Sequence, residues 1–167
     1  MQKTYLTKME DEPGERARSR LQHSMTAREA VADHEAGHVV IARGLGYNIS
    51  FVTIIPDENT KGKTVPPDDE ERRPDHQIII CFAGPAAQVE FAPHSPLCKH
   101  DVYDDQAKAA HVALCNKIDD TTRDDLRHQA RVLVRRHWAR IEIVAKVLLE
   151  RDTLQGQEVD ALLRRST

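Results

Sequence analysis

Two histidines four residues apart, His34 and His38, lie in the run AVADHEAGHVVIARGLG at residues 30–46. On a helix, positions four apart lie one turn above each other, so both imidazoles project from one face and can share one metal ion. Glu35 lies about 100° around the helix from His34, near enough for its carboxylate to reach a water molecule on that ion. Zinc held by nitrogen and oxygen ligands lowers the pKa of such a water to about 7. The pattern predicts that His34 and His38 bind Zn²⁺ beside a general base, Glu35.

A catalytic zinc site needs a third ligand from the protein. The stretch HDVYDDQAKAAH offers five candidates, which are His100, Asp101, Asp104, Asp105 and His111. Cys98 is a further alternative. One of Asp104 and Asp105 is also expected to cap the helix that follows, which leaves the other free to bind metal. Residue types and spacing alone leave this choice open.

The histidines are predicted to lie on a helix over residues 26–43, with Ser24 or Thr26 as N-cap and Gly44 and Gly46 as stop signals. The β-branched run NISFVTIIP predicts a strand at 48–56 that ends at Pro56. Residues 57–75 are too polar to pack and predict a loop, with a short strand at 62–65.

The second half of the chain predicts further helices. Residues 76–93 form an apolar helix in which Gly84-Pro85 marks a kink or a close helix contact, and a loop at 94–105 follows. A short buried helix is expected at 104–118. One long amphipathic helix is expected at 121–151, where apolar residues recur every three or four positions. Thr153 is the predicted cap of a last amphipathic segment.

The composition fits one compact domain at residues 24–167, preceded by a flexible N-terminal tail at 1–23 with mixed charge and few apolar residues. The net charge of −3 arises from 27 acidic and 24 basic side chains that are interleaved, so a nucleic-acid partner is not expected. No apolar stretch approaches the roughly 20 residues of a membrane span. Three cysteines without a CxxC pair favour a reducing, cytoplasmic location.

Several motifs, in order, resemble the peptidase portion of the FtsH family of ATP-dependent zinc metalloproteases. AVADHEAGHVVIA is similar to the metal-binding helix of that family, VTIIP to the strand that follows it, and GKTVPPDDE to a shortened Gly-x-Thr…Pro-acidic stretch. CFAGPAAQVEF resembles its Gly-Gly-Arg-x-Ala-Glu-Glu helix, and VAKVLLERDTLQGQEVDALL its C-terminal end. The resemblance covers about residues 27–164, and Pro85, Gln88 and Val89 depart from it.

The resemblance implies a mainly α-helical, zincin-like metallopeptidase domain with a small β-sheet at the edge of the active site. It makes His34, His38 and Asp105 the zinc ligands and Glu35 the catalytic carboxylate. It also implies that the strand at 51–55 lines the cleft and pairs with an extended substrate. The chain carries no Walker motif, so an unfolding ATPase would have to be a separate partner.

These observations predict a zinc-dependent endopeptidase that hydrolyses peptides or unfolded protein, with zinc polarising the scissile carbonyl and Glu35 moving the proton. The alternative is a metal-binding interaction or regulatory module that keeps the scaffold without useful turnover. A regulatory zinc peptidase that works with a separate DNA-binding repressor is a third possibility. The sequence leaves the substrate and the oligomeric state open.

Overall fold

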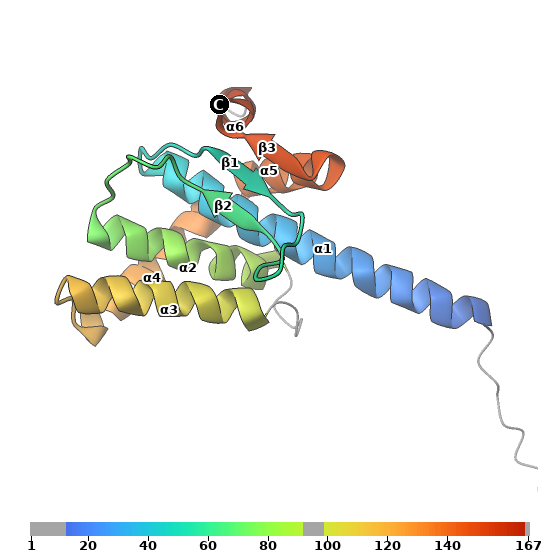
Figure 1. Ribbon diagram of the computed structural model, residues 1–167, viewed down its shortest axis with the longest axis horizontal. Helices are drawn as coiled ribbons and strands as arrows, with labels where there is room; N and C mark the ends of the chain where they lie inside the picture. Colours follow the sequence, from blue (N-terminus) through green and yellow to red (C-terminus); the bar gives the residue numbers. More distant parts are fainter. Residues whose placement is uncertain (1–12, 92–98, 166–167) are drawn as a thin grey trace, which may run out of the picture.

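The computed structural model describes residues 13–91 and 99–165, with the side chains of 13–26 and 99–102 left undescribed. Over these residues the chain is mainly helical and carries one small sheet (Figure 1), as the sequence predicted. The helices are α1 (Pro13–Gly44), α2 (Pro74–Phe91), α3 (Lys99–Cys115), α4 (Asp120–Arg136), α5 (Trp138–Arg151) and α6 (Gly156–Arg165). No helix in this part of the chain has an apolar stretch long enough to cross a bilayer.

Helix α1 lies at the centre of the fold. It packs against α2 on one side and α5 on another, and α2 in turn packs against α3 and α4. All residues of α1 from Ala30 to Ala42 are buried, so this part of the helix is enclosed on every side. A helix buried all around is normally apolar all around. The polar residues in this stretch, including His34, Glu35 and His38, are therefore buried without being part of an ordinary apolar core.

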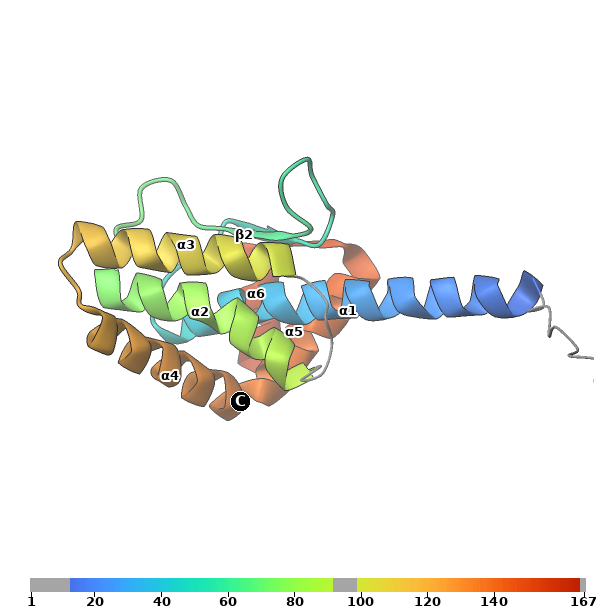
Figure 2. The same ribbon diagram turned by 90° about the horizontal axis from the view of Figure 1, so that it is seen from below.

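The beginning of α1 differs from the prediction of a flexible tail at 1–23. The helix begins at Pro13, well before the predicted caps Ser24 and Thr26, and Figure 2 shows its first turns projecting beyond the rest of the fold. Proline is favoured in the first turn of a helix, and the arginine, glutamate, alanine and glutamine residues that follow are good helix formers. The remainder of the predicted tail, residues 1–12, lies outside the described residues.

The sheet has three short antiparallel strands in the order β2-β1-β3. Strand β1 (Phe51–Thr53) pairs with β2 (Lys63–Val65) on one side and with β3 (Thr153–Gln155) on the other. β1 is much shorter than the strand predicted at 48–56, whereas β2 agrees with the short strand predicted at 62–65. Thr153, predicted to cap a helix, instead lies opposite Thr53 in β3, and α6 begins only at Gly156. Three residues are too few to show an alternating pattern in the sequence.

The long helix predicted at 121–151 is two helices, α4 and α5, separated at His137. The backbone N–H of His137 donates to the carbonyls of Leu133 and Val134 and closes α4. The two helices pack against different partners, α4 against α2 and α5 against α1. Because the apolar spacing continues through the break without glycine or proline, this change of packing partner had no signature in the sequence.

Helix α3 begins at Lys99, earlier than the predicted 104, and part of the loop predicted at 94–105 is therefore helical. Asp104 and Asp105 consequently lie inside the helix, and the prediction that one of them caps its N-terminus is wrong. Both carboxylates are left available for other contacts. Asp105 lies on the side of α3 that faces α1, where it contacts His34 and His38.

Candidate metal centre

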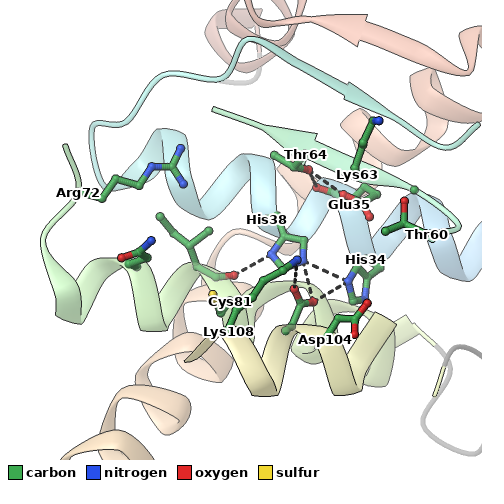
Figure 3. A pocket seen from close by; sticks show the side chains of 14 residues that line it. His34, Glu35, His38, Thr60, Lys63, Thr64, Arg72, Cys81, Asp104 and Lys108 are labelled. Atoms are coloured by element: carbon green, nitrogen blue, oxygen red, sulfur yellow. Dashed lines mark hydrogen bonds and ion pairs between the residues drawn. The ribbon is translucent and has the colours of Figure 1, made fainter. Parts of the chain in front are cut away.

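Two helices bring together the three residues of the candidate centre. His34 and His38 project from α1 toward α3 (Figure 3), and the Nε2 atoms of the two rings lie 3.1 Å apart. The Oδ2 atom of Asp105, on α3, lies 2.9 Å from His34 Nε2 and 3.1 Å from His38 Nε2. All three side chains are buried. The helical spacing of the histidines thus produces the shared face that the sequence predicted.

The three atoms suit a single divalent cation. Bonds of about 2.0 Å at tetrahedral angles separate neighbouring zinc ligands by about 3.3 Å, close to the separations between these atoms. Two imidazole nitrogens and one carboxylate oxygen are also a common donor set for a catalytic zinc site. Among the described residues, His34, His38 and Asp105 are the group that could hold a metal ion. The donor set does not by itself settle which metal.

Each imidazole is oriented by a contact to its other nitrogen. The Nδ1 atom of His34 lies 3.3 Å from the side-chain oxygen of Gln88, and Nδ1 of His38 lies 2.7 Å from the backbone oxygen of Ile80. Oxygen acceptors at Nδ1 place the hydrogen there and leave Nε2 with a lone pair. When neutral, each ring would therefore present an unprotonated Nε2 toward Asp105, which is the tautomer that binds metal.

Helix α2 can approach this centre because glycine faces the rings. A Cβ atom added to Gly84 would lie 2.7 Å from His34 Nε2 and closer still to His38 Nε2. Where α1 meets α2, a Cβ on Gly37 would lie 2.7 Å from the Cβ of Ala87. Pro85 cannot donate to the backbone of Cys81, which weakens the regular helical bonding of this turn of α2. The Gly84-Pro85 pair thus marks a close helix contact, one of the two outcomes the sequence predicted.

Glu35 lies next to the histidines on α1, and its carboxylate is held in place by a residue of the sheet. Its Oε2 atom accepts a hydrogen bond of 2.8 Å from the hydroxyl of Thr64 in β2, and Figure 3 shows these two side chains pointing toward each other. Gly62 lies close by, where a Cβ would be 2.9 Å from Cγ of Glu35. Burial raises the pKa of Glu35, against the charges of His38 and His34 and the hydrogen bond from Thr64. A carboxyl group with a raised pKa is suited to exchanging protons near neutral pH.

The charges of the centre shift one another's pKa values. Burial alone would lower the pKa of His38, but the charge and hydrogen bond of Asp105, helped by Glu35, raise it to about 9. For Asp105, burial alone would raise the pKa, but the charges and hydrogen bonds of His38 and His34 hold it well below its usual range. Without a metal ion, the centre is therefore stabilised by a protonated histidine beside an ionised aspartate.

The centre opens into a cavity of about 190 Å³ between α1, α3 and the residues around β2. Lys63, Arg72 and Lys108 line it together with Cys81 and Asp104. Two of the cations are paired elsewhere, since Lys63 contacts Asp57 and Arg72 contacts Glu70. Burial raises the pKa of the Cys81 thiol to about 12, so it stays protonated at neutral pH. The cavity thus lies directly next to the three candidate ligands.

The other candidate ligands are placed differently. Asp104 lines the cavity but is exposed and does not belong to the ligand group. His111 is exposed and lies 3.6 Å from the sulfur of Cys115. The side chains of Cys98, His100 and Asp101 lie outside the described residues. Of the described candidates, Asp105 is thus the one that meets both histidines.

Two polar contacts of the site were not anticipated. Gln88 was noted as a departure from the family pattern, and the structure places it against His34. A buried glutamine in an otherwise apolar helix could have been read as a hydrogen-bonding partner for a buried polar group. The role of Thr64 had no such sign, because threonine is common in short strands.

The sheet corrects the predicted position of a bound substrate. Strand β1, predicted to pair with an extended peptide, is the central strand, and its two neighbours β2 and β3 use its backbone groups. Within the described residues, β2 pairs with β1 only, so its other edge has backbone groups available. Lys63 and Thr64 of β2 also line the cavity.

No protein-family model matches this chain, and no curated protein sequence matches it. Any functional assignment therefore depends on the residues of the site and on the motifs in the sequence.

Proposed function

We propose that this protein is a zinc-dependent endopeptidase of the FtsH peptidase type, which hydrolyses peptides or unfolded protein. The observation that carries the proposal is the convergence of His34, His38 and Asp105 from two helices, with Glu35 buried beside them. Metal binding alone would not require a carboxylate at the position of Glu35. A buried carboxyl group there is costly unless it has a role, and a general base is the role that fits.

The residues of the site would have separate roles in metal binding and proton transfer. His34, His38 and Asp105 would hold the ion, and Gln88 and the backbone of Ile80 would keep the two rings in the binding tautomer. A zinc ion bound there would supply Lewis acidity and lower the pKa of a water molecule to about 7. Glu35 would accept a proton from the attacking water and later donate it to the leaving amine. Thr64 would hold the Glu35 carboxylate in place during both transfers.

The substrate would be an extended peptide segment. Such a segment can add to the free edge of β2 through backbone hydrogen bonds, which run along the cavity without requiring a particular side-chain sequence. Backbone recognition of this kind requires an extended chain, so folded proteins would have to be unfolded first. A separate ATPase partner would serve that purpose.

The test combines metal analysis with cleavage of an unfolded casein-type substrate. The wild-type protein should bind one zinc ion per chain and cleave the substrate. Glu35→Gln should bind zinc normally and lose cleavage by at least about a hundredfold, the usual contribution of a general base. His111→Ala, which changes an exposed histidine of α3, serves as the matched control and should retain both properties.

Two results would contradict the proposal. Full cleavage by Glu35→Gln would rule out the mechanism. Stoichiometric zinc binding without cleavage of any unfolded substrate would instead favour the interaction or regulatory module.

A further inference from the structure

A second cavity, of about 340 Å³, lies between α2 and α4 and is also lined by Gln106 of α3. On α2 its apolar lining consists of residues that recur every three or four positions and therefore share one face. These residues are Phe82, Pro85, Ala86 and Val89. Val89 is 60% exposed, although it is apolar. We call this cavity the arginine groove, because its other wall is made of arginines.

The three arginines of the groove, Arg127, Arg131 and Arg135, lie four residues apart on α4 and thus on one face of that helix. The guanidinium carbon of Arg127 lies 5.5 Å from the centre of the Phe82 ring. Arg135 donates to Glu90 at 3.1 Å. Arg131 is exposed and forms no hydrogen bond or ion pair with any described residue. The structure thus places these arginines along a groove whose other wall is apolar.

The charge of the groove indicates an acidic occupant. Its lining holds three arginines and a single acidic residue, Glu90, although the whole chain has a net charge of −3. A segment that fits must combine carboxylates for the arginines with an apolar side chain for the Phe82 and Val89 floor. The chain itself contains such a segment in residues 9–12, Met-Glu-Asp-Glu, immediately before α1.

The position of α1 decides which copy of the chain can supply this segment. Arg28 anchors α1 to the body by hydrogen bonds to Leu149 and Asp152. The helix begins at Pro13, and at about 1.5 Å per residue its part before Arg28 spans about 22 Å. Figures 1 and 2 both show this part projecting away from the other helices. Residues 9–12 can reach only about 14 Å back from Pro13, so their own groove is out of reach.

We propose that the arginine groove binds residues 9–12 of a second copy of this chain, so that two chains exchange their acidic segments in a symmetric dimer. In this arrangement the carboxylates of Glu10, Asp11 and Glu12 face the arginine row, and Met9 covers the exposed part of Val89. Each chain contributes one segment and one groove, which closes the assembly at two copies. The contact needs neither the metal nor catalytic activity.

The experiment uses two full-length variants with opposite charge changes. A groove variant carries Arg127→Glu and Arg131→Glu, and a segment variant carries Glu10→Lys, Asp11→Lys and Glu12→Lys. Analytical ultracentrifugation at low ionic strength, with a chelator present, measures the dimer dissociation constant. The wild-type chain should dimerise, and each variant alone should dissociate at least about tenfold more readily. An equal mixture of the two should dimerise again, because each segment then meets a groove of opposite charge.

A control variant with Arg136→Glu and Arg164→Glu makes the same change in net charge at exposed positions outside the groove, and it should dimerise like the wild type. Circular dichroism of every variant checks that the helices are intact. A monomeric wild-type chain would overturn the proposal. So would a dimer that survives the groove variant, or one that the segment variant leaves unchanged, since the occupant would then be a different segment. Failure of mixed variants to reassociate would also overturn it.

Discussion

Gly84 of α2 faces the Nε2 nitrogen of His34 with no side chain between them, and a Cβ atom at Gly84 would lie 2.7 Å from that nitrogen. The position is inside a helix, where glycine is less favourable than alanine by about 1 kcal/mol. An alanine would therefore be expected here on helix propensity alone. The space above the imidazoles explains the glycine, because a methyl group would occupy the region into which both rings project.

The variant Gly84→Ala should therefore affect both zinc affinity and the stability of the metal-free protein. Because a Cβ would collide with both imidazoles, we expect zinc affinity to fall by at least about tenfold, the loss typical of disturbed ligand orientation. Overpacking should also lower the free energy of unfolding of the metal-free protein by about 1–3 kcal/mol. Titration with zinc and chemical denaturation measure the two quantities. Gly44→Ala is the matched control, since nothing lies within 4 Å of a Cβ at Gly44, and it should leave zinc affinity unchanged without lowering the free energy of unfolding. Unchanged zinc affinity in Gly84→Ala would show that the rings do not need this space.

Metal binding should release protons in a pH-dependent manner. The pKa of His38 is raised to about 9 in the metal-free protein, chiefly because Asp105 opposes the effect of burial. At pH 7 this histidine is protonated and must lose its proton to bind a cation. We expect His38 to release about one proton per zinc ion at pH 7, in addition to any proton lost by a zinc-bound water, with the His38 contribution falling toward zero above about pH 10 and an affinity that rises with pH until about pH 9. Calorimetry in two buffers with different heats of ionisation measures the release, and its absence at pH 7 would contradict the assigned charge state.

The histidine pair and its helix could be predicted from the sequence because they depend on local geometry. His34 and His38 share a face as soon as residues 30–46 are helical, whatever surrounds them. The short strand β2 and the helix at α2 were likewise visible as local patterns of residue type. The mainly helical fold with a small sheet follows from the sum of such local signals.

The parts that could not be predicted depend on how distant elements pack. Residue types and spacing did not decide between Asp105 and Asp104, because the choice depends on the rotation of α3 against α1, and only the family resemblance implied Asp105. The break at His137 follows from α4 and α5 packing on different helices. The edge position of β2 depends on the pairing of β1 with β3, whose residues are far apart in the sequence. Each of these three features depends on contacts between residues that are far apart in the sequence.

Thr64 should act on catalysis through Glu35 without affecting the metal. Its hydroxyl donates to Glu35 Oε2 at 2.8 Å, and valine has nearly the same shape without the donor. If the proposed function holds, Thr64→Val should lower kcat by about tenfold or more and leave zinc affinity unchanged, since a positioned carboxylate is required only in the proton transfers. Thr64→Ser keeps the donor and should retain most of the rate. The pH profile should separate this role from simple packing, because loss of the hydrogen bond moves the pKa of Glu35 further upward. Equal losses in the serine and valine variants would indicate a packing role.

Asp33 should make the stability of the fold depend on pH. Burial, together with the charges of Glu142 and Glu29, raises the pKa of Asp33 to about 7. An acid whose pKa is higher in the folded state favours folding below the unfolded pKa of about 4, and this contribution is lost as the pH rises toward and through the folded value. Asp33→Asn removes the titration. Relative to this variant, the wild-type protein should lose about 2 kcal/mol of unfolding free energy between about pH 4 and pH 8, after allowance for partial solvent access.

Chemical denaturation across this pH range measures the difference, and two further variants control for it. Asp124→Asn changes an exposed aspartate of α4 and should parallel the wild type at every pH. Glu142→Gln removes one of the charges that raise the pKa of Asp33, so the loss of stability should end at a lower pH and become smaller. If the stability of the wild-type protein relative to Asp33→Asn instead rose with pH, the pH dependence would have the opposite sign to the one expected. Asp33 would then be ionised and paired in the folded state, in conflict with its burial beside two other carboxylates.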